Sequence, residues 1–129
     1  MSDFKKLLVW RKGHALVLNV HRVAVKIRGV EIASLRNQMM RAAMSIPTNL
    51  VEGNGQESSK EFARFVRFSL NSSSELEYHL ILAKDLNAIT HTDFESLSAQ
   101  TVEVRRMLYG LRRKLDQLSA DARRKTVKE

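Results

Sequence analysis

The chain has 129 residues, which suits one domain with a core of its own, and we expect a single domain over residues 1–129. It has a net charge of +8 and no cysteine, so disulfides and thiolate metal sites are excluded. One proline and five glycines are few chain breakers for this length, and they favour long helices over many short strands.

The first predicted helix spans residues 8–27. Its apolar positions step by four and three residues, which places them on one face of a helix: Val9, Gly13, Leu16, Val20, Val23 and Ile27. Residues 28–34 read as a connection, and Ser34 is placed to cap the helix that follows.

The second predicted helix spans residues 35–52. Its apolar face consists of Leu35, Met39, Ala42 or Ala43, Ile46 and Leu50. Pro47 lies inside this helix, removes one backbone donor and is expected to bend the axis. Gly53 and Gly55 are expected to end it.

The third predicted helix begins at a capping box formed by Ser58 and Glu61 and continues to about residue 86. Its apolar members are Phe62, Phe65, Val66, Leu76, Leu80 and Ala83, and residues 71–74 are small and polar, which permits close approach of another helix.

The fourth predicted helix has the most regular pattern in the chain. Thr92 and Glu95 repeat the capping-box spacing at its start. Heptad-like positions follow at Leu97, Thr101, Val104, Leu108, Leu111, Leu115 and Leu118. The pattern stops at about residue 120, so the basic tail is expected to fray.

Four long helices with short links predict an all-α fold, an antiparallel up-down-up-down four-helix bundle. The apolar run of residues 7–10 is too short for the core of a secretory signal, and no run approaches the ~20 residues that span a bilayer. We therefore expect a cytoplasmic protein with no membrane partner.

Several motifs along nearly the whole chain resemble one known family. They are Leu8-Val9-Trp10, Gln38, residues 41–49 (Arg-Ala-Ala-Met-Ser-Ile-Pro-Thr-Asn), Glu52-Gly53, Lys60-Glu61-Phe62, Phe65, Ser72, Glu75-Leu76-Glu77, His79-Leu80 and residues 108–111. With these motifs the chain resembles the 23S ribosomal RNA intervening-sequence proteins. The resemblance implies a four-helix bundle that assembles as a ring-like homopentamer, and it brings no established catalytic activity. Accessory proteins of diversity-generating retroelements look similar, and they bind nucleic acid and a reverse transcriptase.

A polar stripe is predicted on one side of the second helix. Its members step by three or four residues: Gln38, Arg41, Ser45, Asn49 and Glu52. One interpretation is a binding site for a backbone or a phosphate group. The other is a hydrogen-bonded network that supports the proline bend, where the carbonyl of Ala43 loses its helical partner.

The sequence contains no clear pattern of metal-binding, cofactor-binding or catalytic residues. A di-iron bundle needs two Glu-x-x-His elements, and here Glu75 and His79 are four apart with no second copy. The serines at 69, 72, 73 and 74 lack a paired base in sequence, and a tight helix crossing explains them better. We expect no metal, no cofactor and no catalytic residue.

Aromatic and basic residues alternate at the start of the third helix. Phenylalanines recur every three residues with cations between them: Phe62, Phe65, Phe68, Lys60, Arg64 and Arg67. Such a pattern can stack nucleic-acid bases, and it is also what a core or subunit interface produces.

The two ends of the chain are basic and its middle is acidic. Residues 1–28 carry +6, residues 29–104 carry −4 and residues 105–129 carry +6. In the predicted bundle both basic segments meet at one end, where a ring of copies would multiply the positive field that attracts polyanions. The residues predicted to form this site are Lys5, Lys6, Arg11, Lys12, Arg112, Arg113, Lys114, Arg123, Arg124 and Lys125. The other interpretation is a surface that only solubilises the protein.

These observations favour a non-enzymatic, oligomeric scaffold that binds nucleic acid, RNA before DNA, without reading its sequence. The alternative is a protein–protein adaptor with an acidic or helical partner and no nucleic-acid role.

Overall fold

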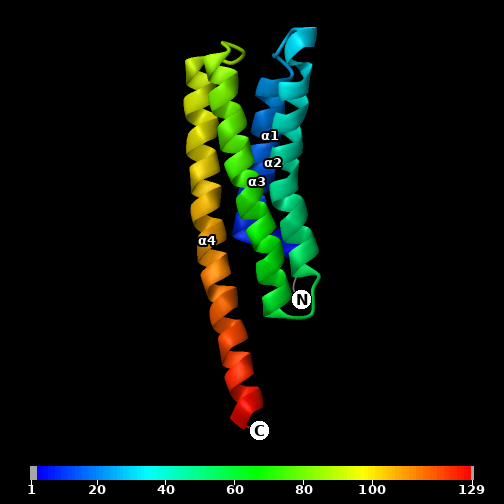
Figure 1. The fold of residues 1–129 in the computed structure, drawn as a ribbon, viewed down its shortest axis with the longest axis vertical. Helices are drawn as coiled ribbons and strands as arrows, with labels where there is room; N and C mark the ends of the chain where they lie inside the picture. Colours follow the sequence, from blue (N-terminus) through cyan, green and yellow to red (C-terminus); the bar gives the residue numbers. More distant parts are fainter. Residues whose placement is uncertain (1–2, 129) are drawn as a thin grey trace.

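The computed structural model describes residues 3–128, and within that range it contains helices and no strand (Figure 1). Its four long helices are α1 (Leu8–Ala24), α2 (Ala33–Asn54), α3 (Ser59–Asp85) and α4 (His91–Lys128). Two short 3-10 helices, η1 (Phe4–Lys6) and η2 (Val30–Ile32), precede α1 and α2.

The helices alternate in direction and form the predicted antiparallel up-down-up-down four-helix bundle (Figure 1). Each helix packs against its two neighbours around the bundle, and α1 closes it by packing on α4. The prediction of an all-α bundle is therefore confirmed. Figure 1 also shows that α4 is longer than the others and projects past the end of the bundle where the chain starts.

The core consists of the faces that the sequence pattern predicts. The fully buried large side chains include Leu16 and Val20 of α1, Met39, Ile46 and Leu50 of α2, Leu76 and Leu80 of α3, and Leu97, Val104 and Leu108 of α4. The α4 pattern holds as far as Leu115, whereas Leu118 is 45% exposed because α4 there is reaching the end of the bundle.

Several helix boundaries differ from the predicted ones. Helix α1 ends at Ala24 instead of residue 27, although Ile27 is still buried. The N-terminal cap of α4 is Thr90, whose Oγ1 accepts the N–H of Asp93 at 3.0 Å, so the predicted capping role of Thr92 is wrong. The predicted cap at Ser58 is confirmed, because its Oγ accepts the N–H of Glu61 at 3.1 Å.

The end of α4 also differs from the prediction, because the helix continues to Lys128 instead of losing its structure at about residue 120. Every side chain from Asp121 to Val127 is exposed. We call residues 121–128 the α4 arm. A helical arm with no buried side chain in its described part presents its whole surface to solvent or to a partner.

Gly53 lies inside α2 and does not end it, which corrects the prediction that it stops the helix. A Cβ on Gly53 would lie 2.7 Å from the ring of Phe62 and 2.8 Å from the Cβ of Phe65. The absence of a side chain here therefore lets α3 approach α2. The true C-cap is Gly55, whose φ of −81° is open to any residue.

None of the helices in the described part of the chain is both long enough and apolar enough to cross a membrane.

Candidate nucleic-acid interface

Three side-chain pairs show how α1 lies along α4. Lys12 Nζ lies 3.2 Å from Glu103, Asn19 donates to Gln100 at 2.7 Å, and Lys26 Nζ lies 2.9 Å from Asp93. Residues further along α1 contact residues earlier in α4, because the two helices are antiparallel. The start of α1 is therefore level with the part of α4 beyond residue 103. The two basic segments therefore lie at the same end of the bundle, as predicted.

The N-terminal cations divide between two sides of that end. Lys12 and the exposed Arg11 belong to α1, and Lys12 faces α4. Lys5 and Lys6 belong to η1, which packs on α1 and α2 and not on α4. Their backbone is held there because Phe4 of η1 packs edge-on against Trp10, with ring centroids 4.9 Å apart.

The cations of α4 occupy two levels. Arg112, Arg113 and Lys114 lie within the bundle, before the arm. Arg123, Arg124 and Lys125 lie on the arm, and eleven residues at a rise of about 1.5 Å place them roughly 16 Å further along the axis. The ten predicted cations thus surround one end of the molecule and its projecting arm, and they do not form one compact cluster.

Most of these cations have no strong partner. Four of the ten are paired: Lys5 with Asp3, Lys12 with Glu103, Arg112 with Asp116 and Arg124 with Asp121. All four pairs lie near the surface, where an ion pair contributes little. Within the described part of the chain no carboxylate pairs with the other six, which are Lys6, Arg11, Arg113, Lys114, Arg123 and Lys125. Their charges are available to a polyanion.

The predicted polar stripe of α2 separates into two parts. Ser45 and Asn49 are half-buried and belong to a network between α2 and α3. Asn49 Nδ2 donates to the carbonyl of Ser45 at 2.9 Å and to its Oγ at 3.0 Å, and Ser72 Oγ bonds Ser45 Oγ at 2.7 Å. This part agrees with the structural interpretation of the stripe.

The other members of the stripe, Gln38, Arg41 and Glu52, are exposed. Gln38 and Arg41 border a shallow hollow on α2 together with Met40 and Met44. Beside Pro47, the buried Ser69 of α3 donates from its Oγ to the carbonyl of Ile46 at 2.8 Å, which ties α3 to α2.

The aromatic residues of α3 are packed rather than open. Phe62 is buried, and Phe65 and Phe68 are half-buried with their rings edge-to-face at 5.7 Å. The Arg64 guanidinium lies over both rings, 5.6 Å and 5.3 Å from their centroids. Because both rings are partly buried and the guanidinium lies over them, this cluster is a poor platform for stacking bases.

Arg105 is a polar link that the sequence pattern did not reveal. From α4 it donates to Ser73 Oγ, to the Ser73 carbonyl and to Glu77 Oε1, each at 3.2 Å. It explains why α3 carries a serine at a fully buried position. The sequence does not distinguish Arg105 from the adjacent Arg106, which is exposed and has no such role.

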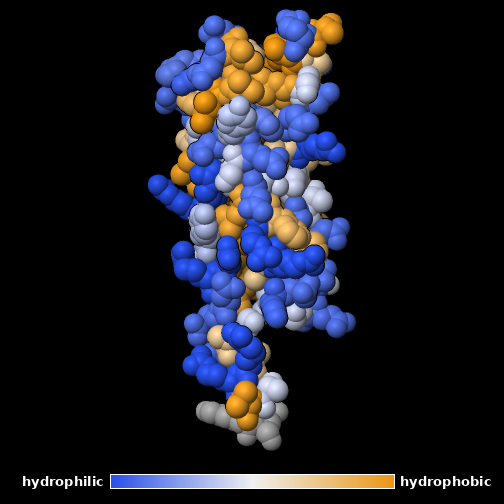
Figure 2. Space-filling model, viewed as in Figure 1, coloured by the Kyte–Doolittle hydropathy of each residue, from blue (hydrophilic) through white to orange (hydrophobic). Residues whose placement is uncertain are grey.

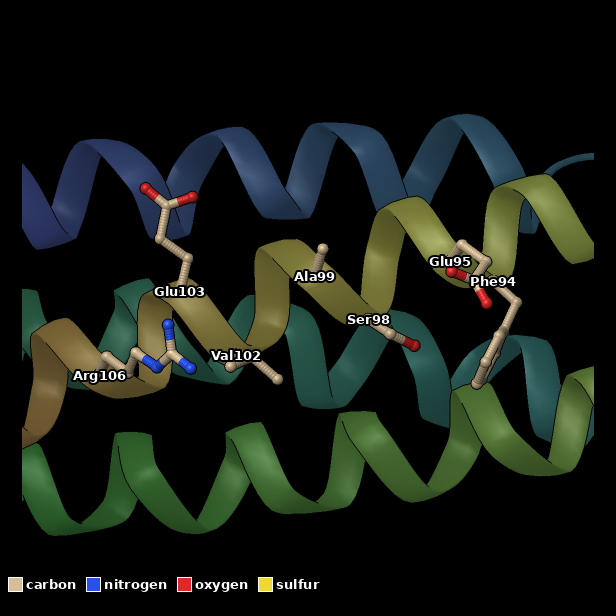
Figure 3. A pocket seen from close by; sticks show the side chains of 7 residues that line it. All are labelled: Phe94, Glu95, Ser98, Ala99, Val102, Glu103 and Arg106. Carbon is tan, nitrogen blue, oxygen red and sulfur yellow. The ribbon is translucent and has the colours of Figure 1, made fainter.

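A shallow groove of about 400 Å³ runs along the outer side of α4 (Figure 3). Small residues, Ser98, Ala99 and Val102, form its floor, and Glu95, Glu103 and Arg106 lie beside them. In Figure 3 the Glu103 side chain points toward α1, whereas Phe94 and Ser98 point toward α3.

The opposite end of the bundle is apolar. Figure 2 shows apolar side chains gathered where the α1–α2 and α3–α4 connections lie. Exposed members there are Val25, Val30 and Leu86. Among the described residues, no three His, Cys, Asp or Glu side chains are grouped so that they could hold a metal ion.

The sequence profile of the 23S rRNA-intervening sequence protein family matches residues 5–110. The chain belongs to this family. A crystal structure of a family relative supports the fold: a protein of unknown function from the S23 ribosomal protein family of Bacteroides thetaiotaomicron. The two chains are 21% identical with a TM-score of 0.74, over 81% of this chain and 97% of that one. No curated protein matches the chain. The family match ends at residue 110, so most of the basic stretch of α4 lies beyond it.

Proposed function

We propose that this member of the family is a non-enzymatic, oligomeric scaffold that binds nucleic acid, RNA before DNA, at the basic end of its bundle. The binding is electrostatic and tolerates any sequence, because the cations are exposed side chains that would contact phosphates and not base edges.

The observation that carries the proposal is the unpaired charge on the far part of α4. Arg113, Lys114, Arg123 and Lys125 are exposed, and no carboxylate pairs with them in the described part of the chain. A surface that only solubilises the protein does not require its cations to be concentrated at one end of a long helix. Charge of one sign in one place attracts a polyanion at long range.

Fluorescence anisotropy with labelled single-stranded RNA and DNA at low and physiological salt tests the proposal. The variant Arg113→Glu/Lys114→Glu/Arg123→Glu should lose most binding, and the affinity of the wild type should fall steeply as salt rises because phosphate contacts release counterions.

The matched control reverses three exposed cations elsewhere, in Arg28→Glu/Arg41→Glu/Arg67→Glu, and so changes the net charge by the same amount. It should retain most of the affinity. Equal loss in both variants would mean that net charge alone acts, or that the site lies near Arg67. Absence of binding to RNA and DNA at low salt would end the nucleic-acid proposal.

The proposal includes self-association, with five copies as the number that the family resemblance implies. Large apolar side chains are about half exposed on α1, α2, α3 and α4, at Leu18, Met44, Tyr78 and Tyr109. Exposed apolar surface of this kind marks contacts with other proteins. Light scattering should give a mass near five times 14.8 kDa.

One observation favours the adaptor as a second candidate. A groove of about 680 Å³ lies between the start of α3 and the end of α4. Leu118, Ala122 and Val127 give it an apolar side, and Lys60 and Arg123 border it. An acidic amphipathic helix would fit such a groove.

Competition distinguishes the two candidates. If the site takes nucleic acid, polyglutamate should displace labelled RNA only at a large excess. If polyglutamate binds as tightly as RNA, and Leu118→Glu weakens its binding, the partner is an acidic polypeptide.

A further inference from the structure

Helix α1 has two faces, and the second of them is a seam on the outside of the bundle. One face supplies the core, and the other faces solvent with the heptad-like spacing of a packed helix: Leu8, Arg11, Ala15, Leu18, Arg22 and Val25. Leu8, Leu18 and Val25 are 54%, 53% and 52% exposed. We call this set the α1 seam. An apolar heptad face with no partner is unusual on a helix that already has a core face.

The groove on α4 has the complementary properties. Its floor of Ser98, Ala99 and Val102 is small enough to admit a larger side chain (Figure 3). Glu95 lies at one end of the groove and Glu103 lies at the other, beside Arg106, whereas the seam carries Arg11 and Arg22. Large apolar residues with two cations on one surface thus correspond to small residues with two carboxylates and one cation on the other.

The carboxylates are held only loosely within their own chain. Glu95 has one partner, the exposed His91 at 3.3 Å. Glu103 pairs with Lys12, and both side chains are about half exposed. Neither pair is strong enough to prevent the carboxylate from binding another cation.

The heights of the two surfaces along the bundle also match. The contacts of Lys12 with Glu103, Asn19 with Gln100 and Lys26 with Asp93 show which residues are level. By that register Arg11 is level with Glu103, Leu18 with Ala99, and Arg22 with Glu95. Rotation of a second copy about an axis parallel to the bundle keeps every one of these heights.

We propose that the α1 seam of one copy packs into the α4 groove of the next copy, with Leu18 over Ala99 and with Arg11 and Arg22 paired to Glu103 and Glu95. This inference rests on the self-association proposed above and assigns the two surfaces that make it. The occupant is a second copy because charge, side-chain size and height all correspond within this one chain.

The contact is heterologous, since it joins two different surfaces of the same protein. The seam and the groove lie on neighbouring helices and point away from the bundle in different directions. Each copy is therefore turned relative to the one before it, and repeated turns about the long axis close a ring where the turn divides a full circle. In such a ring the basic ends and the α4 arms of all copies point the same way.

The first test is the mass in solution of Leu18→Glu, measured by size-exclusion chromatography with light scattering. This change places a charge at the centre of the contact and should weaken association by roughly tenfold or more. The control is Leu86→Glu at the C-terminal cap of α3, because Leu86 is 52% exposed and Leu18 is 53% exposed. The control should assemble as the wild type does, and circular dichroism should show both variants folded.

The second test exchanges one predicted ion pair. Arg22→Glu alone and Glu95→Arg alone should each weaken assembly, because each places like charges together across the contact. The double variant Arg22→Glu/Glu95→Arg should restore it, which a purely structural effect within one chain would not do. If the double variant assembles no better than the single variants, the pairing is overturned.

The outcomes separate this inference from the proposed function. An oligomer that survives Leu18→Glu overturns the assigned contact but leaves self-association standing. A wild type that has the mass of one chain, 14.8 kDa, at all concentrations overturns both. RNA binding is measured independently, so its absence leaves the contact unaffected.

Discussion

The α2–α3 crossing and the far end of α4 are built in opposite ways. At the crossing, small polar side chains are buried and hydrogen-bonded, as for Ser69 with the carbonyl of Ile46. On the α4 arm every described side chain is exposed, and cations such as Arg123 have no acidic partner. The first region determines the fold, because loss of one atom there leaves another unsatisfied. The second region is free to change without cost to the fold, which suits a surface that binds a partner.

The largest effect on stability is expected at Gly53. In Gly53→Ala the new Cβ would lie 2.7 Å and 2.8 Å from Phe62 and Phe65, so α3 must shift away from α2. We expect a loss of about 1–3 kcal/mol in the free energy of unfolding, measured by urea denaturation.

Gly55→Ala is the matched control for this change. The nearest atom to a Cβ at Gly55 is a carbonyl oxygen at 3.6 Å, and the backbone there is ordinary αR. Its stability should remain within about 0.5 kcal/mol of the wild type. Equal losses in the two variants would mean that glycine is needed here for chain conformation and not for the close approach of the helices.

A smaller effect on stability is expected in the polar stripe of α2, where two residues of the same helix can be compared. Asn49→Ala removes two hydrogen bonds to Ser45 at a half-buried position and should cost about 1 kcal/mol. Glu52→Ala changes an exposed side chain that has no partner in the described part of the chain, and it should leave the melting temperature unchanged. A loss at Glu52 equal to that at Asn49 would show that the stripe acts as one network.

The sequence predicts the bundle well because a helix face is a local property. The spacing of Leu16, Val20 and Val23 alone places them in the core, and the structure confirms it. The same holds for the cap at Ser58, which needs only its own next turn.

What could not be predicted depends on the register between helices. The sequence places Ser45 and Glu52 on one stripe, but only the position of Ser72 on α3 decides that Ser45 is bonded and Glu52 is not. The link from Arg105 to Ser73 joins residues 32 apart and leaves no periodic signal. The basic ends were correctly expected at the same end of the bundle, whereas η1 carries Lys5 and Lys6 to the α2 side because Phe4 packs on Trp10.

The smallest effect on stability is expected from removing the α4 arm. A chain that ends at Ala120 loses no buried side chain of the described arm, so its free energy of unfolding should change by less than about 0.5 kcal/mol. Its binding should change far more, because Arg123, Arg124, Lys125 and Lys128 are lost while Arg113 and Lys114 remain. If these four cations contact phosphates, the slope of log affinity for single-stranded RNA against log salt should become shallower by up to about 3, at roughly 0.7 per contact. Anisotropy titrations at several salt concentrations measure this slope.

An unchanged slope with unchanged stability would mean that the arm does not contact RNA. The proposed site would then consist only of the cations within the bundle. A large loss of stability would mean instead that the arm contributes to packing, either against another copy or against the start of α3, with which it lines a groove.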